Sequence, residues 1–410
     1  MISPAEAHQI VMAHVEPRSP ERVSLAAACG LELAEEISAD REYPPFDRAM
    51  MDGYAVRLAD AGRAVACVGE IAAGQSSSLS LADGRCVEIM TGAACPPGTE
   101  AVVPKEAVRR DGDRVWLPAP LGRGAKIAPR GSDCPAGAVA LHPGDTITPL
   151  GVAVMASFGI SSVAVRARPS MAIITTGAEL VPAGEVPAPQ QIRDSNGPML
   201  AAMAVQIGLD RPLLLHADDA IESIGRALDE ARDHELLLLT GGVSAGNYDL
   251  VPRVLEDRGA EIIFYKVTQK PGKPLLFARR GGQWVFGLPG NPLASHLCFS
   301  RYVAAAARKM AGQAPTPRAF EGVLAAPVEY DGGRTYFCPA RALRDGRDGN
   351  RWQVSPLPAR NSSDIFTPAS ASCYLTVPPR SSLAAGAVVW FEWMCGIAEN
   401  AEGGGSPERE

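Results

Sequence analysis

The sequence contains no C-x-x-C pair, no membrane-length apolar run and no secretion signal. Its nine cysteines are scattered and odd in number among 410 residues, a pattern that argues against a disulfide framework or a zinc site and favours reduced thiols. No apolar run approaches the roughly 20 residues that span a bilayer. The first residues lack the apolar core of a signal peptide. We therefore expect a cytoplasmic protein without a membrane partner.

Basic residues are also fewer than acidic residues. The chain has 39 Lys and Arg against 46 Asp and Glu, which gives a net charge of -7. A broad nucleic-acid-binding face requires a basic patch, so we expect no nucleic-acid partner. An anionic small ligand remains compatible with this composition, provided that a few cationic side chains and backbone N–H groups hold it locally.

Common catalytic motifs are missing as well. The sequence has no G-x-S-x-G elbow, no P-loop and no Ser/His/Asp arrangement, and its six histidines lack the spacing of metal ligands. Glycine and proline are abundant instead, with 41 and 35 residues and no collagen-like period. Many turns and short strands are therefore expected, with the functional residues on loops.

The length predicts several domains, because one domain holds roughly 150 residues. Residues 3–15 read as a helix that begins with a capping box of Ser3 and Glu6, and residues 21–40 as a helical or mixed stretch. The remaining boundaries follow changes of pattern. We expect an N-terminal region of residues 1–45 with 133–168, a small β-domain at 46–132, an α/β domain at 169–314, a barrel-like β-domain at 315–397 and a disordered tail at 398–410.

Residues 169–314 repeat a strand–loop–helix rhythm. Apolar runs such as LLLL, without alternation, indicate strands buried on both faces. The pattern predicts a doubly wound domain with a mostly parallel sheet, within a multidomain α/β plus β protein. The candidate strands are 171–175, 212–216, 235–239, 261–265 and 283–287, and the candidate helices are 198–207, 220–233, 250–258 and 292–311.

Small and polar residues follow four of these strands, in the runs TTGAEL, TGGVSAGNYDL, KVTQKPGKP and LPGNP. The carboxyl ends of parallel strands share one edge of a sheet, where ligands bind. The glycine-rich loop offers backbone N–H groups to an anion, Lys270 and Lys273 add local positive charge, and Asn291 with Pro292 suits the start of a helix. Each run taken alone is more typical of a turn or a cap, so the convergence carries the prediction.

Five carboxylates are candidate ligands for Mg²⁺. If they converge, they are hard oxygen ligands suited to a cation beside a phosphate; otherwise they are ordinary surface acids. They are Asp52, Glu179, Asp218, Asp219 and Asp249.

The runs MDGYAV, IMTGA, RGSD, TTGAEL, RDSNGPML, TGGVSAGNYD, KPGKP and LPGNP occur in this order. Together they closely resemble the molybdopterin molybdenumtransferases, which comprise bacterial molybdenum-insertion enzymes and the E-domain of gephyrin, from about residue 3 to 395. The resemblance implies insertion of molybdenum from molybdate into adenylated molybdopterin, with release of AMP and a requirement for Mg²⁺. It also implies an elongated homodimer in which the N-terminal region dimerises, and an active cleft between the α/β domain of one subunit and the 46–132 domain of the other. Further candidate partners are the molybdopterin adenylyltransferase and recipient molybdoenzymes.

Matched motif by motif, the resemblance implies roles for single residues. Asp52 and Thr91 would line the molybdate end. The catalytic set would be Asp52, Thr91, Glu179 and Asp249, and the Mg²⁺ ligands Glu179, Asp249 and one or both of Asp218 and Asp219. The residues that hold AMP, pyrophosphate and pterin would be Gly177, Gly241, Gly242, Ser244, Gly246, Lys270, Lys273, Pro289, Asn291 and Pro292.

Two departures from the family pattern bear on these roles. Ala178 stands where the family usually has Asp, and Asn361-Ser362-Ser363-Asp364 stands where a Gly-Ser-Gly turn is common. These departures favour one alternative, a non-catalytic relative that binds and delivers the cofactor or acts as a scaffold. A second alternative is a molybdopterin adenylyltransferase of the related single-domain kind, against which the flanking β-domains argue because that chemistry needs only the α/β unit.

Overall fold

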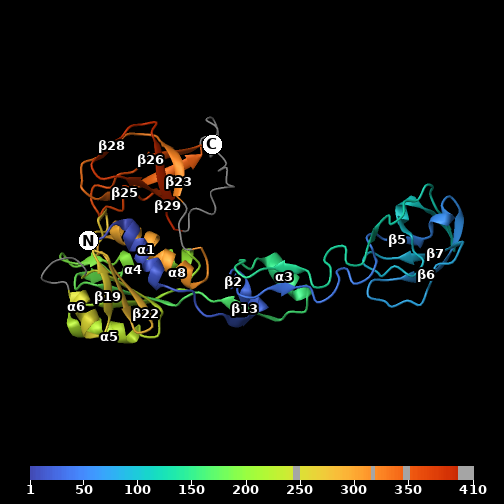
Figure 1. Cartoon of the computed structure of the whole chain (residues 1–410), viewed down its shortest axis with the longest axis horizontal. Helices are drawn as coiled ribbons and strands as arrows, with labels where there is room; N and C mark the ends of the chain where they lie inside the picture. Colours follow the sequence, from blue (N-terminus) through green and yellow to red (C-terminus); the bar gives the residue numbers. More distant parts are fainter. Residues whose placement is uncertain (243–249, 315–318, 345–350, 396–410) are drawn as a thin grey trace. The chain divides into compact units, whose positions relative to one another are not determined.

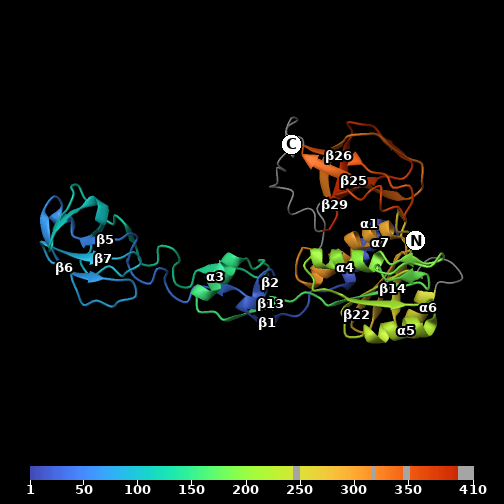
Figure 2. The same cartoon turned by 180° about the vertical axis from the view of Figure 1, so that it is seen from behind.

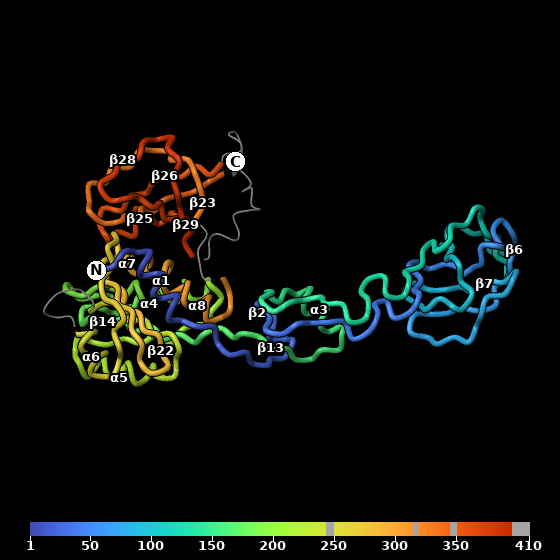
Figure 3. The backbone as a smooth tube through the Cα atoms, in the orientation of Figure 1, coloured from blue at the N-terminus to red at the C-terminus, as the bar shows by residue number. Residues whose placement is uncertain are grey.

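The structure is a computed structural model that describes residues 1–242, 250–314, 319–344 and 351–395. The chain forms two compact units (Figure 1). Unit 1 comprises Met1–Glu21 and Arg166–Glu410, and unit 2 comprises Arg22–Val165. The tube in Figure 3 shows how the blue N-terminal segment and the green-to-red remainder belong to the same unit. Within the described ranges, no helix has the length and apolar character that crossing a bilayer demands.

A six-stranded sheet forms the centre of unit 1, in the order β17-β14-β18-β22-β21-β19. The first four strands are parallel, and β21 is antiparallel to both of its neighbours. The five predicted strands are present, whereas β21 was not predicted. The bounds are β14 (Met171–Thr176), β17 (Leu213–Ala217), β18 (Leu236–Thr240), β19 (Glu261–Tyr265), β21 (Leu276–Arg280) and β22 (Gln283–Leu288).

Helices cover both faces of this sheet (Figures 1 and 2). One face packs against α1 (Pro4–His14), α4 (Asn196–Gln206) and the continuous segment of α7 (Pro292–Cys298), the π-helix η3 (Phe299–Val303) and α8 (Ala304–Met310). The other face packs against α5 (Ile221–Glu230) and α6 (Leu250–Asp257). The LLLL run of β18 packs against both helical layers, because Leu236 and Leu238 belong to the core on one face of the sheet and Leu237 and Leu239 to the core on the other face. The predicted capping box of Ser3 and Glu6 is present at the start of α1.

The C-terminal part of unit 1 is a barrel-like sheet in the order β20-β25-β26-β23-β29-β27, which an additional β25–β27 pairing closes. Strand β20 belongs to the KPGKP segment and pairs in parallel with the start of β25. The bounds are β20 (Gln269–Lys270), β23 (Ala319–Leu324), β24 (Val328–Tyr330), β25 (Thr335–Arg344), β26 (Trp352–Pro356), β27 (Cys373–Val377), β28 (Ser381–Leu383) and β29 (Val388–Trp393). A short ladder of β15 (Leu180–Val181) and β16 (Ile192–Arg193) completes unit 1.

Unit 2 contains a further six-stranded sheet in the order β8-β5-β7-β6-β10-β9. Its strands are β5 (Gly53–Val56), β6 (Ala64–Ile71), β7 (Arg85–Ile89), β8 (Ala101–Pro104), β9 (Arg109–Asp111) and β10 (Arg114–Trp116), with the short helices η1 (Leu58–Asp60) and η2 (Lys105–Ala107). The other elements are β1 (Glu21–Ser24), α2 (Leu25–Ala28), β2 (Glu32–Leu33), β3 (Ile37–Ser38), β4 (Arg48–Ala49), β11 (Ile127–Ala128), β12 (Val139–Leu141), α3 (Pro149–Ser157) and β13 (Ser162–Arg166).

The buried β18 leucines provide a test of the core. Leu238 is 0% exposed, so Leu238→Ala should lower the free energy of unfolding of unit 1 by about 2–5 kcal/mol, through lost apolar burial and a residual cavity. Leu214→Ala on β17 is the control, because Leu214 is 41% exposed. Urea denaturation measures both changes, and equal losses for the two variants would contradict the described packing.

Candidate functional site

The hydroxyl of Thr240, at the carboxyl end of β18, joins three loops of unit 1. It accepts a hydrogen bond from Nδ2 of Asn196 at 2.9 Å and donates one to the carbonyl of Pro289 at 3.0 Å. The Asn196 Nδ2 also donates to the Gly290 carbonyl at 2.7 Å. Thr240 and Asn196 are buried, so these bonds satisfy polar groups that water cannot reach. The SNG, TGG and LPGN runs therefore meet at one edge of the sheet.

Two glycines allow the loops to approach closely. A Cβ at Gly241 would come within 2.4 Å of the Thr176 carbonyl oxygen, and the φ of Gly241 is +99°, a conformation that favours glycine. A Cβ at Gly177 would come within 2.6 Å of Oε2 of Glu179, because the Glu179 carboxylate lies against this backbone. Gly242, with a φ of +59°, continues the turn after β18.

The predicted acidic ligands are only partly described. Thr176 and Ala217 are register partners on β14 and β17, so Glu179, Asp218 and Asp219 all follow strands that end at the same edge, and all three are exposed. Among the described residues, no group of three possible metal ligands forms. Ser244, Gly246 and Asp249 lie outside the described residues.

A cavity of about 420 Å³ lies between the KPGKP and LPGNP segments and the C-terminal barrel-like part of unit 1. Its described lining carries four cationic side chains and no carboxylate: Lys270, Lys273, Arg334 and Arg360. Pro289 and Asn291 also line it, together with Tyr336, Asn361 and Ser362. The predicted lysines therefore share a cavity, and such a lining suits a multiply charged oxyanion.

Asn291 begins a helix as predicted, but its side chain has other partners than the helix. It occupies the N-cap position of α7, with Pro292 in the first turn as expected, but its side chain makes no capping hydrogen bond. Its Nδ2 instead donates to the Ser362 hydroxyl at 2.6 Å, and its Oδ1 accepts from the Ser363 hydroxyl at 2.7 Å. The Ser363 hydroxyl is thus the donor to Oδ1 in place of a backbone N–H group of α7, and both serines connect the C-terminal turn to the LPGN loop.

That C-terminal turn is internally locked by Asp364. The Asp364 carboxylate accepts hydrogen bonds from the Thr367 hydroxyl at 2.7 Å and from the backbone N–H groups of Thr367 and Arg360, each at 3.1 Å. Led by the Thr367 hydroxyl bond, these donors lower the pKa of Asp364 to about 2. The sequence that departs from Gly-Ser-Gly thus forms a defined turn that presents Arg360 and Ser362 to the cavity.

Buried polar side chains hold the KPGK turn in place through hydrogen bonds. Gln269 is 0% exposed; its Nε2 donates to the Gly272 carbonyl at 3.1 Å, and its Oε1 accepts from the Tyr302 hydroxyl at 2.6 Å. Arg334 donates from Nη1 to the Gln269 carbonyl at 3.2 Å. The turn that carries both lysines is therefore held by the η3 helix and by the segment before β25.

Sequence reasoning missed Arg334 and Arg360. Neither lies in a strand-end run of the α/β domain, and no local pattern distinguishes them from solvated arginines. They reach the cavity because β20 pairs with β25 and because Asn291 binds the 362–363 turn. Only knowledge of these tertiary contacts could have identified them.

Asp52 and Thr91 contact each other in unit 2. One carboxylate oxygen, Oδ1 of Asp52, accepts from the Thr91 backbone N–H at 2.8 Å and from its hydroxyl at 2.7 Å. These two bonds, and to a smaller extent the positive charge of Lys105, lower the pKa of Asp52. Lys105 itself pairs with Glu88 at 2.8 Å. Asp52 is therefore a fixed, ionised carboxylate at neutral pH.

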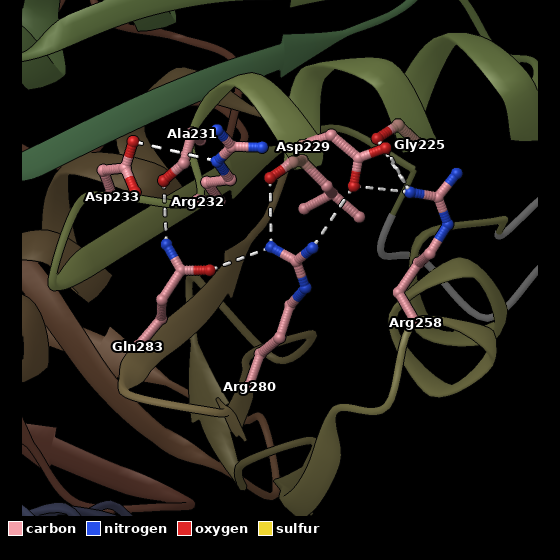
Figure 4. Close-up of polar contacts among 9 residues, drawn as sticks. Gly225, Asp229, Ala231, Arg232, Asp233, Arg258, Arg280 and Gln283 are labelled. Atoms are coloured by element: carbon pink, nitrogen blue, oxygen red, sulfur yellow. Dashed lines mark hydrogen bonds and ion pairs between the residues drawn. The ribbon is translucent and has the colours of Figure 1, made fainter.

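A second hollow, of about 510 Å³, lies at the amino-terminal edge of the unit 1 sheet. Its arginines bind Asp229: Arg258 contacts both carboxylate oxygens at 2.6 Å, and Arg280 lies at 3.4 Å and also donates to Gln283 (Figure 4). Arg232 pairs with Asp233 at 3.8 Å. Acidic side chains of the same unit therefore neutralise much of the positive charge of this hollow. The described lining of the first cavity contains no such acid.

Comparison with known families decides the identity of the fold. Residues 2–159 match the family described as MoeA N-terminal region (domain I and II), residues 172–309 match a probable molybdopterin binding domain, and residues 321–392 match the MoeA C-terminal region (domain IV). The chain belongs to the MoeA family. The resemblance drawn from the motifs and the predicted fold class are thereby confirmed.

Individual relatives agree with this assignment. A protein named molybdopterin molybdenumtransferase from Synechocystis sp. is 33% identical over 386 residues, which cover 92% of this chain and 96% of that protein. One of the same name from Staphylococcus aureus (strain MRSA252) is 32% identical over 355 residues, or 84% of each chain. The crystal structure of a molybdopterin biosynthesis MoeA protein from Pyrococcus horikosii superposes with a TM-score of 0.80 at 26% identity, over 96% of this chain and 99% of that one.

The Asp52–Thr91 pair gives a prediction on pH dependence. Thr91→Val removes the hydroxyl donor and should raise the pKa of Asp52 towards its ordinary value, because the ionised form loses a hydrogen bond. Any stability that Asp52 contributes through its lowered pKa is present above its unfolded-state pKa, and it disappears as the pH falls through the folded-state pKa. In Thr91→Val that contribution should be smaller, and its loss should be complete at a higher pH, because only the folded-state pKa has risen.

Carboxyl NMR titration of aspartate-labelled protein measures the pKa of Asp52 directly. Thr91→Ser keeps the hydroxyl and is the matched control, with an expected titration close to that of the wild type. An Asp52 pKa unchanged by Thr91→Val would show that the hydroxyl does not stabilise the carboxylate.

Proposed function

We propose that this chain is a molybdopterin molybdenumtransferase. It takes molybdate and adenylated molybdopterin, inserts molybdenum into the pterin dithiolene and releases AMP. The observation that carries the proposal is the cavity lined by Lys270, Lys273, Arg334 and Arg360 in a chain of the MoeA family. The positive charge of this cavity suits molybdate and the pyrophosphate group of adenylated molybdopterin, which are both oxyanions.

The cavity acts by position and charge. Lys270 and Lys273 stand on a turn held by Gln269, and Arg360 on a turn held by Asp364, so the cations need little rearrangement when an oxyanion enters. Cations fixed in this way stabilise the negative charge that develops on the phosphate oxygens as AMP leaves. No covalent enzyme intermediate is required, since orientation of the two substrates supplies the rate enhancement.

The role proposed for Mg²⁺ rests on the exposed carboxylates at the sheet edge. Glu179 and Asp218 or Asp219 follow adjacent strands, and Mg²⁺ is commonly bound by one or two carboxylates together with substrate phosphates and water. The described acids fit that mode, although they form no three-ligand group. We propose that they hold Mg²⁺ together with Asp249; when bound, the cation would neutralise phosphate charge. The remaining predicted substrate contacts, including Gly241, Gly242, Ser244 and Gly246, are part of the same proposal.

The proposal extends to assembly and location. Asp52 and Thr91 would act at the molybdate end from the partner subunit of a homodimer, as the family resemblance implies. The protein would work in the cytoplasm. Its further partners would be the molybdopterin adenylyltransferase and the recipient molybdoenzymes.

Removal of one cavity cation tests the activity. Lys273→Ala should lower the rate of AMP release from adenylated molybdopterin, with molybdate and Mg²⁺ present, by about 10²- to 10³-fold, the usual cost of losing one electrostatic contact to a developing oxyanion. Arg226→Ala, on the exposed side of α5, is the control and should keep wild-type turnover. If the wild type binds the pterin tightly but never releases AMP, the chain is a binding relative and the proposal fails.

Mixing two inactive variants tests the homodimer. When Asp52→Ala and Lys273→Ala chains are co-expressed, the heterodimers contain one site with both lesions and one with neither, so about a quarter of wild-type activity should return under random pairing. Each variant expressed alone remains inactive. Activity that stays absent in heterodimers isolated by two different tags would contradict a site shared between subunits.

A further inference from the structure

Lys270 is flanked by two tyrosine rings instead of a carboxylate. Its Nζ lies 5.2 Å from the ring centroid of Tyr330 and 5.1 Å from that of Tyr336. The two ring centroids are 5.0 Å apart, and both tyrosines are 8% exposed. Among the described residues, no acid forms an ion pair with Lys270. Both distances lie within the range of cation–π attraction.

The two tyrosines come from the C-terminal part of unit 1, yet they are fixed to the lysine turn. Lys270 and Tyr336 are register partners across β20 and β25, and the backbone N–H of Thr335 donates to the Thr268 carbonyl at 3.2 Å. A Cβ at Gly332 would come within 2.3 Å of the Tyr330 hydroxyl, so the absence of a side chain there makes room for this ring. The segment from Tyr330 to Tyr336 thus forms an aromatic clamp on Lys270.

The choice of aromatic partners has a consequence for charge. A carboxylate beside Lys270 would hold the ammonium group in place, but it would also neutralise its charge and repel an incoming oxyanion. The face of an aromatic ring attracts a cation without adding a net negative charge. The clamp therefore restricts the position of Lys270 and leaves its positive charge available to the cavity.

We propose that Tyr330 and Tyr336 are positioning residues for the transfer reaction: through Lys270, they set the affinity of the cavity for a substrate oxyanion. This inference rests on the proposed function. The oxyanion is either molybdate or the pyrophosphate group of adenylated molybdopterin, and separate measurements of KM for the two substrates distinguish these sources.

The test replaces Tyr330 in the full-length chain. Tyr330→Leu removes the ring and should raise KM for one of the two substrates about three- to tenfold, with kcat changed less than about twofold, because the attraction that orients the ammonium group is lost. Tyr330→Phe keeps the ring face and is the matched control, with KM close to wild type. Tyr330→Met is a second ring-free variant of similar volume, for use if the leucine variant does not fold.

A double-mutant cycle separates positioning from general stability. On a Lys270→Gln background, Tyr330→Leu should have no further effect on KM, because the tyrosine acts through the ammonium group. Isothermal titration with molybdate alone, and with inorganic pyrophosphate alone, gives a readout independent of turnover. The inference is overturned if Tyr330→Leu keeps wild-type KM for both substrates, if the phenylalanine variant is impaired equally, or if the leucine effect persists without Lys270. These outcomes differ from failure of the proposed function, in which the wild type itself releases no AMP.

Discussion

One buried hydroxyl, that of Thr240, holds together the loops at the carboxyl-terminal edge of the unit 1 sheet. It lies where β18 ends, and it bonds at once to the Asn196 amide and the Pro289 carbonyl. The Gly290 carbonyl, which can only accept, fixes the orientation of that amide. A polar group buried without partners is costly, so these loops can leave their places only together. These bonds thus tie the start of α4 and the LPGN loop to the end of β18.

Two arginine-containing hollows of unit 1 show how the same residue types serve different ends. At the amino-terminal edge, Asp229 binds Arg258 and Arg280, so the charges offset one another and join α5 to the end of α6 and to β21. At the other edge, the described lining holds four cations without an acid, and backbone, amide and aromatic groups keep them in position. An acidic chain with a net charge of -7 can thus still gather positive charge around one cavity.

The sequence predicted most of the α/β domain because its strands are buried on both faces and its loops carry distinctive small residues. Strand β21 was not predicted, because the run LLFARR follows a proline-rich turn and ends in two arginines. The Gly281-Gly282 turn before β22 was a hairpin signal that could have found it. Asn291 was placed correctly at a helix start, but the hydroxyls that engage its side chain are distant in sequence. The Asp52–Thr91 contact follows from the β5–β7 register of Gly53 with Ile89, which the motifs alone could not supply.

The hydrogen bonds between Asn291 and two serines bear on how the C-terminal segment of this chain could be exchanged. The LPGN loop and the 361–364 turn lie about 70 residues apart in the sequence, yet the Asn291 amide forms hydrogen bonds with the hydroxyls of both Ser362 and Ser363. Loss of Asn291, or of both serines, would break this link between the two segments, and water would then hydrate the exposed polar groups that remain. A chimera that gives this chain another C-terminal segment therefore keeps this contact only if the new segment supplies both hydroxyls.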